Sequence, residues 1–457
     1  MTKPMLFVAM PFGKKKDSSG TYEIDFDRVY NLAIKPAAEA ANVEVIRADE
    51  ERSGGIIHTP MFERLLLAEI VIADVTIPNP NVFYELGVRH CARPRSTILI
   101  YGKVSHLPFD VFMIRALPYN LEDGLLHEAE AERLKTEIQQ KLEAAKTDLE
   151  VKDSPLFQLI PKFPGISLPH EVTESFRDRA RYIDSVRDQL GKARHLGDPG
   201  KAIGRIKEME ASLGDFNETH SEILVDLLLS YRDVEAFDEM VSLVERLPRP
   251  VSDAVTIREQ HAFALNKRNN PGDRREAIHI LQRIIDEHGY SPETCGLYGR
   301  IYKDLYEEVI QREKQEEAAT YLNEAIKWYR HGFESDPRDY YPGINAATLL
   351  FTKGDEESIA ELRMLVPAVS FAVARRGGIQ SRDYWDVATV LEAAVLTEDW
   401  EHTRRAAGRL PILDAPGWNV KTTLKNLRII RSIRLERELS NKDLDDVIQQ
   451  LAASLEE

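Results

Sequence analysis

Hydrophobic and polar positions follow two different patterns along this chain. Up to about residue 125, short apolar runs rich in β-branched residues alternate with segments whose apolar residues recur every three or four positions. Beyond about residue 170 only the second pattern, which is typical of amphipathic helices, continues. The chain is therefore predicted to be an α/β domain followed by an all-α region.

Five apolar runs in the first part predict five strands: Leu6–Met10, Val43–Ile46, Ile70–Val75, Thr97–Tyr101 and a fifth that begins at Leu117–Tyr119. Segments with the periodicity of an α-helix separate these strands. They cover Asp25–Ala41, with an expected kink at Pro36, then Ile57–Ala68, and the stretch after Asn79. Because parallel strands need crossover connections, this alternation predicts a doubly wound parallel sheet of the flavodoxin-like order 2-1-3-4-5.

The strand order also predicts where a ligand would bind. In such sheets ligands collect beyond the carboxyl ends of the strands at the switch point, here strands one and three. Two segments border that place, Met10–Lys16 and Asp74–Glu85, and Asp49 is a more distant candidate. The basic run Lys14–Lys16 is expected to be a solvated loop. The candidate site residues are Glu85 as the catalytic carboxylate, with Met10, Pro11, Phe12, Asp74, Asn81 and Tyr84 as substrate-binding residues.

Several of these residues have an ordinary structural explanation as well. Asn79 or Asn81 can cap the helix, and an acidic residue in its first turn is favoured by the helix dipole, so Glu85 has a helix-end role as its alternative. Asp74 could bind a ribose hydroxyl or satisfy turn N–H groups. The aromatic residues could stack on a base or belong to the core. Arg89 and His90 could contact phosphate, with a solvated face or an ion pair as alternatives.

Composition excludes several classes of protein. The chain has 457 residues and a formal charge of −16, of which residues 1–125 hold 14 basic against 16 acidic residues and the remainder 46 against 60. An acidic surface repels phosphate backbones, so no nucleic-acid partner is expected. No apolar run is long enough for a membrane span or a signal peptide, and the two cysteines, Cys91 and Cys295, form no disulfide framework. We expect a cytoplasmic protein with no membrane partner, no metal site and no cofactor.

Nucleotide-binding motifs of the common kinds are also missing. The first strand is not followed by GxGxxG, and Gly197–Ala202 fails the P-loop pattern in spacing and in its last residue. A Rossmann dehydrogenase and a P-loop NTPase are therefore disfavoured.

The second part of the chain shows recurring helices. After a helix over Leu126–Leu149 and a segment with four prolines up to Pro169, similar small-residue positions recur at Ala264, Gly299 and Ala346, 35 and 47 residues apart. A period near 34 predicts tetratricopeptide-like helical pairs stacked as a solenoid, with an irregular bundle as the alternative. The predicted domains are 1–125 (α/β), 126–169 (helix and proline-rich linker) and 170–457 (helical array).

The first 120 residues resemble the TIR-like and nucleoside 2-deoxyribosyltransferase-like group, through Val8–Gly13, Ile46–Asp49, Ile72–Thr76 and Asn79–Gly87. In that group the glutamate of the Tyr-Glu-Leu-Gly phrase, which corresponds to Glu85, attacks or stabilises the ribosyl C1′ when an N-glycosidic bond is cleaved. A carboxylate under the anomeric carbon suits the oxocarbenium-like charge that develops there. Met61 stands where deoxyribosyltransferases usually carry a second acid. The resemblance therefore favours NAD or another substrate with a good leaving group over ordinary nucleosides.

A second resemblance covers about residues 170–400. The phrases Cys295–Asp304, Trp328–Glu334 and Gly343–Leu350 resemble the tetratricopeptide-like TRAFs-binding region of apoptosis signal-regulating kinases, which also place a TIR-like domain before it. No glycine-rich loop, VAIK-like lysine, HRD or DFG element follows, so kinase activity is not expected.

Three hypotheses follow from the two resemblances. The leading one is a signalling or defence effector that hydrolyses NAD or a related nucleotide under control of the helical array, as a homo-oligomer with a protein partner. The alternatives are a non-catalytic interaction scaffold and a nucleoside deoxyribosyltransferase-like enzyme.

Overall fold

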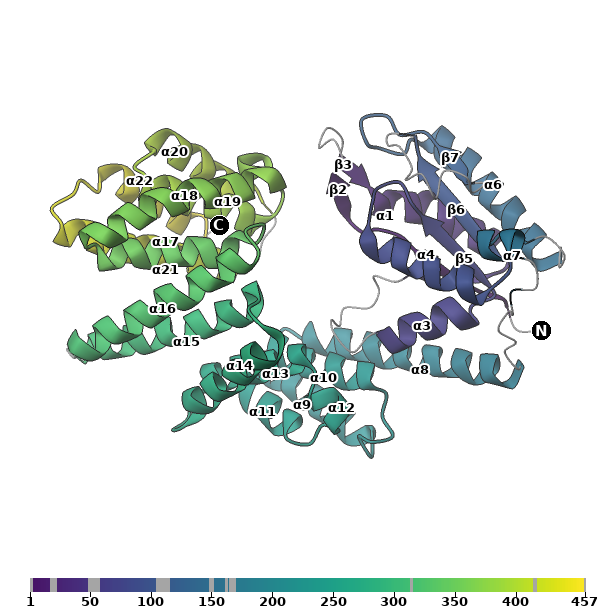
Figure 1. Cartoon of the computed structure of the whole chain (residues 1–457), viewed down its shortest axis with the longest axis horizontal. Helices are drawn as coiled ribbons and strands as arrows, with labels where there is room; N and C mark the ends of the chain where they lie inside the picture. The colour runs from purple at the N-terminus through teal and green to yellow at the C-terminus, as the bar shows by residue number, and fades with distance from the viewer. Residues whose placement is uncertain are drawn as a thin grey trace. The chain divides into compact units, whose positions relative to one another are not determined.

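The computed structural model describes residues 3–16, 23–47, 58–103, 116–147, 152–160, 163, 170–312, 315–413 and 417–455. Its contacts divide the chain into two compact units, Met1–Val234 and Glu235–Glu457 (Figure 1). Asp49 and Ile57 lie outside the described residues. Within the described ranges, no helix is both long and apolar enough to span a bilayer.

The first unit contains a five-stranded parallel sheet in the order β4-β1-β5-β6-β7. The strands are β1 (Met5–Ala9), β4 (Glu44–Arg47), β5 (Ile70–Asp74), β6 (Thr97–Gly102) and β7 (Leu117–Tyr119). Counted along the chain, this is the 2-1-3-4-5 order, so the predicted strand order is confirmed.

Helices cover both faces of this sheet, because alternate strand residues point to opposite sides. Leu6, Val8 and Ile72 pack with α1 (Phe26–Val29), η1 (Tyr30–Ile34), α2 (Lys35–Ala40) and α6 (Glu128–Thr147). Phe7 and Val71 face the other way, toward α3 (His58–Leu67) and α4 (Pro80–Ala92). Both faces are therefore buried, as the apolar runs of the strands require.

The predicted kink near Pro36 takes the form of a π-helical turn. Proline has no N–H and its ring collides with the carbonyl four residues earlier, so an α-helical bond pattern cannot continue through it. The turn Tyr30–Ile34 lies directly before it, and the Lys35 N–H donates to the Tyr30 carbonyl, five residues back. The helix widens there instead of ending.

The basic run Lys14–Lys16 is not the loop that the sequence predicted. It forms β2, which pairs antiparallel with β3 (Glu23–Asp25). All three lysine side chains are exposed, and Lys14 Nζ lies 3.8 Å from Asp25 Oδ2. The run is solvated as expected, but its backbone is paired.

The remaining described helices of the first unit are α7 (Pro155–Leu159), α8 (His170–Arg194), α9 (Pro199–Ser212) and α10 (Ser221–Asp233). The α7 segment lies within the predicted proline-rich linker and is anchored to the sheet region. The Asp153 Oδ2 accepts from the Thr97 N–H at 2.9 Å, and the Ser154 hydroxyl donates to the His90 carbonyl at 2.7 Å. The start of the linker thus packs against the sheet region.

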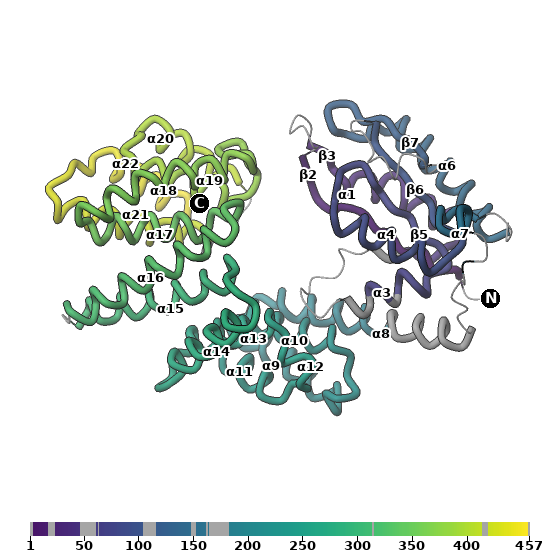
Figure 2. Tube along the Cα trace, viewed as in Figure 1, coloured from purple at the N-terminus to yellow at the C-terminus, as the bar shows by residue number. Residues whose placement is uncertain are grey.

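The second unit is helical throughout its described residues, and Figure 2 follows it from teal to yellow. Successive helices pair as hairpins. Their bounds are α11 (Phe237–Val244), α12 (Arg249–Ser252), α13 (Val255–Arg268), α14 (Asp273–His288), α15 (Pro292–Gln311), α16 (Gln315–Ser335), α17 (Tyr340–Lys353), α18 (Glu356–Arg376), α19 (Tyr384–Leu396), α20 (Trp400–Arg409), α21 (Gly417–Glu436) and α22 (Lys442–Ala453), with 3₁₀ turns η3 (Gly378–Gln380) and η4 (Leu410–Ile412).

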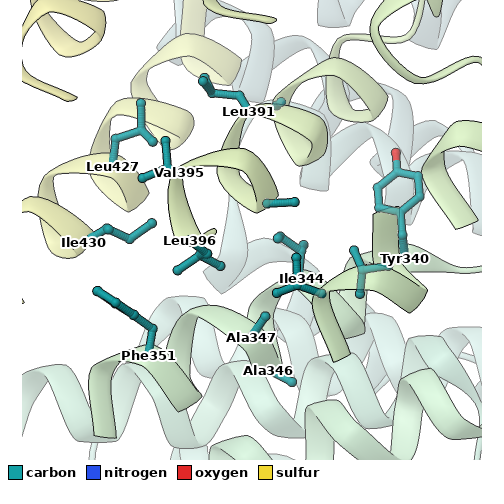
Figure 3. Packing of buried hydrophobic residues seen from close by; sticks show 14 of the residues in the cluster. Tyr340, Ile344, Ala346, Ala347, Phe351, Leu391, Val395, Leu396, Leu427 and Ile430 are labelled. Atoms are coloured by element: carbon teal, nitrogen blue, oxygen red, sulfur yellow. The ribbon is translucent and has the colours of Figure 1, made fainter. Parts of the chain in front are cut away.

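The three small residues that recur in the sequence, Ala264, Gly299 and Ala346, lie on α13, α15 and α17, the first helices of successive pairs. Figure 3 shows side chains of α17, α19 and α21 packing into the core of this unit. Small residues do lie at helix crossings: a Cβ on Gly299 would come within 2.7 Å of the Tyr329 ring, and one on Gly343 within 2.6 Å of Val369 Cγ2. The longer interval before Ala346 reflects the length of α15 and α16.

Candidate functional site

The predicted site residues lie beyond β1 and β5, in very different environments. Met10 and Pro11 are buried, whereas Phe12 is 50% exposed and Asn81 is fully at the surface. Tyr84 is 57% exposed and meets Phe62 edge to face, with ring centroids 6.1 Å apart. The exposed Phe12 and Tyr84 are not core residues, so the core alternative for these two aromatics is wrong.

Asp74 ends β5 and is completely buried in a hydrogen-bonded network. Its Oδ1 accepts from the Thr76 N–H at 2.9 Å and from the Thr76 hydroxyl at 2.5 Å, and its Oδ2 accepts from the Tyr119 hydroxyl at 2.8 Å. The Thr76 hydroxyl also receives the Gly102 N–H at 2.8 Å. The network joins the ends of β5, β6 and β7, so the turn-satisfying interpretation describes Asp74 well.

Burial raises the pKa of Asp74 to about 6, although the hydrogen bonds from Thr76 and Tyr119 act in the opposite direction. Desolvation disfavours the ionised carboxylate, and three donors do not fully compensate. Burial also raises the pKa of Tyr119 well above its usual value, so it stays a donor. Tyr119 was not among the predicted site residues because it lies 45 positions from Asp74.

Glu85 lies in the second turn of α4. Asn79 is the N-cap and its side chain accepts from the Asn81 and Val82 N–H groups at 3.0 and 3.5 Å. The first turn contains no acidic residue. Glu85 is 8% exposed and takes part in an interaction within the chain. The helix-end role proposed as its alternative is therefore wrong, because the dipole effect is confined to the first turn.

Arg89, one turn after Glu85, is a buried connector and contacts no solvent. Its Nη1 donates to the carbonyls of Leu65 and Ala68, both at 2.8 Å. Its Nη2 donates to the carbonyls of Glu69 and Ser96 at 3.2 and 3.3 Å. The guanidinium thus satisfies the end of α3 and ties it to the start of β6, so neither the phosphate contact nor its alternatives describe Arg89.

His90 is equally unsuited to bind phosphate. Burial, with the charge of Arg89, lowers the pKa of His90 to about 4. The imidazole is therefore neutral near pH 7 and offers no positive charge.

A second group of polar residues lies on the first helices of the pairs in the second unit. We call Lys267, Arg300, Lys303 and Lys425 the cationic cluster; they come from α13, α15 and α21. Lys303 keeps some access to solvent, yet desolvation by the surrounding protein lowers its pKa, as it does for Lys267. Cationic side chains that are desolvated but reachable are suited to an anionic partner group.

Most carboxylates near this cluster already have a hydrogen-bond or ion-pair partner. Glu307 Oε2 lies 2.8 Å from Lys425 Nζ, and Asp304 Oδ2 accepts from Asn266 Nδ2 at 2.7 Å. Glu392, buried on α19, accepts from Asn426 Nδ2 at 3.0 Å, and burial raises its pKa. Within the described part of the chain, Lys303 and Lys267 are left without an ion pair. Sequence reasoning missed this cluster because its members are spread over more than 150 positions.

Aromatic rings line the neighbouring hairpin. Tyr298 stacks on Trp328 with centroids 4.0 Å apart, and Tyr302 stacks on Tyr298 at 5.8 Å. Tyr290, 53% exposed, stacks on His331 at 4.8 Å. The Tyr298 hydroxyl donates to Gln282 Oε1 of α14 at 3.2 Å. These contacts join α14, α15 and α16.

Comparison with known families identifies the helical part. The profile of the MAP3K TRAFs-binding domain matches residues 82–450, which is most of the chain and reaches back into α4. The chain belongs to this family. The match confirms the second resemblance seen in the sequence.

Known relatives are large kinases. Mitogen-activated protein kinase kinase kinase nsy-1 of Caenorhabditis elegans is 28% identical over 88% of this chain, mitogen-activated protein kinase kinase kinase 15 of Mus musculus 27% over 82%, and mitogen-activated protein kinase kinase kinase 5 of Homo sapiens 25% over 85%. The chain spans only 28 to 29% of the length of these relatives.

Among solved structures, the TPR2AB-domain:pHSP90-complex of yeast Sti1 covers 60% of this chain and is 99% covered itself, with 14% identity and a TM-score of 0.20.

Proposed function

We propose that this chain is a regulatory protein-interaction module that binds a TRAF-type protein through its helical array. The observation that carries the proposal is the family match over residues 82–450. The kinase relatives support a role in signalling. The non-catalytic scaffold, first considered as an alternative, thus becomes the preferred function.

The cationic cluster is the proposed contact surface on the array. Charged groups that remain reachable but unpaired favour a partner with complementary carboxylates. Tyr341 adds an aromatic group there, because it is 44% exposed and lies close enough to Arg300 for the charge of Arg300 to act on its hydroxyl. Tyrosine and arginine are enriched among the residues that dominate binding energies.

The test is a titration of the full chain with a purified TRAF protein, followed by calorimetry. We expect saturable binding, and the substitution Lys303→Glu should weaken it by about tenfold or more. Lys442→Glu, at an exposed lysine on α22, makes the same charge change outside the cluster and should leave binding intact. Absence of binding by the unaltered chain would refute the proposal, while equal loss in both variants would refute the assigned surface.

Hydrolysis of the N-glycosidic bond of NAD or a related nucleotide is the second candidate function. The observation that favours it is the burial of Glu85 in the second turn of α4, where a dipole role does not explain it. Incubation with NAD should release nicotinamide from the unaltered chain and not from Glu85→Gln. No release at high protein concentration from either chain would exclude it. Met61, on α3, packs against the apolar core, so we do not extend the proposal to nucleoside deoxyribosyl transfer.

Finer structural assignments belong with these proposals. We propose that the sheet region is TIR-like and flavodoxin-like, which the 2-1-3-4-5 strand order supports. We propose that the helical hairpins form a tetratricopeptide-like solenoid, supported by small residues at helix crossings. The domains 1–125, 126–169 and 170–457, a cytoplasmic location and homo-oligomerisation are likewise proposed.

A further inference from the structure

Helix α18 carries apolar side chains on its solvent-facing side. Met364 is 72% exposed and Phe371 is 70% exposed. The exposed residues recur at alternating intervals of four and three positions, the repeat of a helix seam that packs against another helix. This seam consists of Ala360, Met364, Pro367, Phe371 and Ala374.

The opposite face of α18 already packs inward. Leu362, Val366, Val369 and Val373 are buried in the core of the second unit. The fold therefore leaves a second apolar face uncovered, with two large side chains seven positions apart. Contiguous exposed apolar groups of this kind mark interaction surfaces.

The two ends of the seam have opposite charges. Glu357 lies in the first turn of α18 and Arg375 in the last. Both are exposed, and within the described residues neither takes part in an ion pair. A helix with the same pattern running antiparallel would place its own Arg375 beside Glu357, and its own Glu357 beside Arg375.

We propose that α18 of a second copy of this chain docks antiparallel on the seam and forms a symmetric dimer. In the register that places Phe371 over Ala360 of the second copy, Met364 meets Pro367 and the charged ends pair twice. Large residues then oppose small ones, which is how helix pairs interdigitate. An isologous interface needs such self-complementarity. The proposal concerns self-association and holds whether or not a TRAF-type partner binds.

The size of the contact sets its strength. One helix pair lies at the low end of specific interfaces, below about 1,200 Å² of buried surface, where complexes are weak and transient. We therefore expect a reversible dimer with a dissociation constant in the micromolar range.

Sedimentation equilibrium of the full chain over a range of concentrations tests the seam. Met364→Asp and Phe371→Asp should each raise the dimer dissociation constant by about tenfold or more. Ile412→Asp is the matched control, since Ile412 is 70% exposed on η4 and lies outside the seam. A chain that stays monomeric throughout, or equal losses in seam and control variants, would overturn the proposal.

Charge reversal tests the register. Glu357→Arg and Arg375→Glu should each weaken self-association by about tenfold, because like charges then meet at both ends. An equimolar mixture of the two single variants should associate again, since each mixed pair restores both opposite-charge contacts. Their recovery on mixing also shows that both variants are folded. Failure of the mixture to associate would refute the antiparallel arrangement, and a loss of TRAF binding without any loss of self-association would assign the seam to that partner instead.

Discussion

The sheet region and the helical array bury polar side chains in different ways. In the sheet region buried charges bind the backbone: Arg89 donates to four carbonyls, and Asp74 receives a turn N–H in addition to the hydroxyls of Thr76 and Tyr119. In the array, buried carboxylates pair with other side chains, as Glu259 does with Thr294 at 2.6 Å and Glu392 with Asn426 at 3.0 Å. The comparison shows two solutions to the same desolvation problem.

The two regions bury polar side chains differently because their helices end in different surroundings. In the sheet region α3 ends inside the fold, and its last carbonyls need donors that only a distant side chain supplies. In the array many helices begin at an exposed aspartate that caps them locally, such as Asp339 and Asp383. Buried polar residues there are free to join neighbouring helices. Substitutions should therefore act through the backbone in one region and through side-chain pairs in the other.

The largest expected effect is that of Arg89→Met. Removing the guanidinium leaves several buried carbonyls without a donor, and we expect a loss of about 3–5 kcal/mol in the stability of the sheet region. Hydrogen exchange in β5 and β6 measures it. All four tryptophans lie between residues 328 and 418, so their fluorescence reports the array alone and should not change.

Arg89→Lys refines this prediction, because a lysine can reach only part of the set of carbonyls. The Arg89→Lys variant should retain more protection against hydrogen exchange than Arg89→Met, but less than the unaltered chain. Lys103→Met, at an exposed lysine just after β6, serves as the control. Loss of less than about 1 kcal/mol in Arg89→Met would contradict the connector role.

Asp74 should make the sheet region more stable in mild acid. Its pKa is about 6 in the folded chain and 3.8 ordinarily, so the folded state holds the proton more tightly. This contribution is fully present below about pH 4 and is lost as the pH rises through about 6, a change of about 3 kcal/mol. Hydrogen exchange of β5 at pH 4.5 and 7 should show the difference, and Asp74→Asn should abolish it. If the stability of the sheet region still changes between pH 4.5 and 7 in Asp74→Asn, another titrating group causes the change.

Local patterns predicted much of the fold. Apolar runs identified every strand of the parallel sheet, and Asn79, one of the two predicted caps, begins α4. Small residues marked helix crossings in the array. The β2–β3 pairing was missed because three lysines look like a solvated loop until Glu23–Asp25 lie beside them.

The candidate site was less predictable, again because its residues find their partners far away in the sequence. The sequence suggested a solvated Arg89 because three of its four carbonyl partners lie 20 or more positions away in the chain. Asp74 meets Tyr119, which belongs to a three-residue strand 45 positions away. The seam of α18 could not be told from its core face, because a helical repeat does not say which apolar side is covered.

In the array, close helix packing should be sensitive to added volume. Gly343→Ala would place a methyl within 2.6 Å of Val369 Cγ2 and 2.8 Å of the Phe333 ring, and we expect a loss of about 2 kcal/mol. The tryptophan fluorescence midpoint in urea measures it. Gly408→Ala, at a helical glycine of α20 in the same unit where an added Cβ would come no closer than 4.0 Å to Gln450 Nε2, is the control and should be neutral or stabilising by up to about 1 kcal/mol.

The smallest effect should come from Thr294→Val, which removes the hydroxyl that bonds the side chains of Glu259 and Ser291 and makes no backbone hydrogen bond of its own. The Thr294 hydroxyl donates to buried Glu259, whose pKa burial raises and this bond lowers. Without the donor that pKa rises further, so the ionised carboxylate costs more, and we expect a loss of about 1–2 kcal/mol. Because a raised folded pKa favours the protonated form, the loss should be present at pH 8 and shrink at pH 5. Glu259→Gln in the same background should remove that pH dependence. A penalty equal at both pH values would mean that Thr294 acts through packing, and the contrast between the two regions would then not hold at this pair.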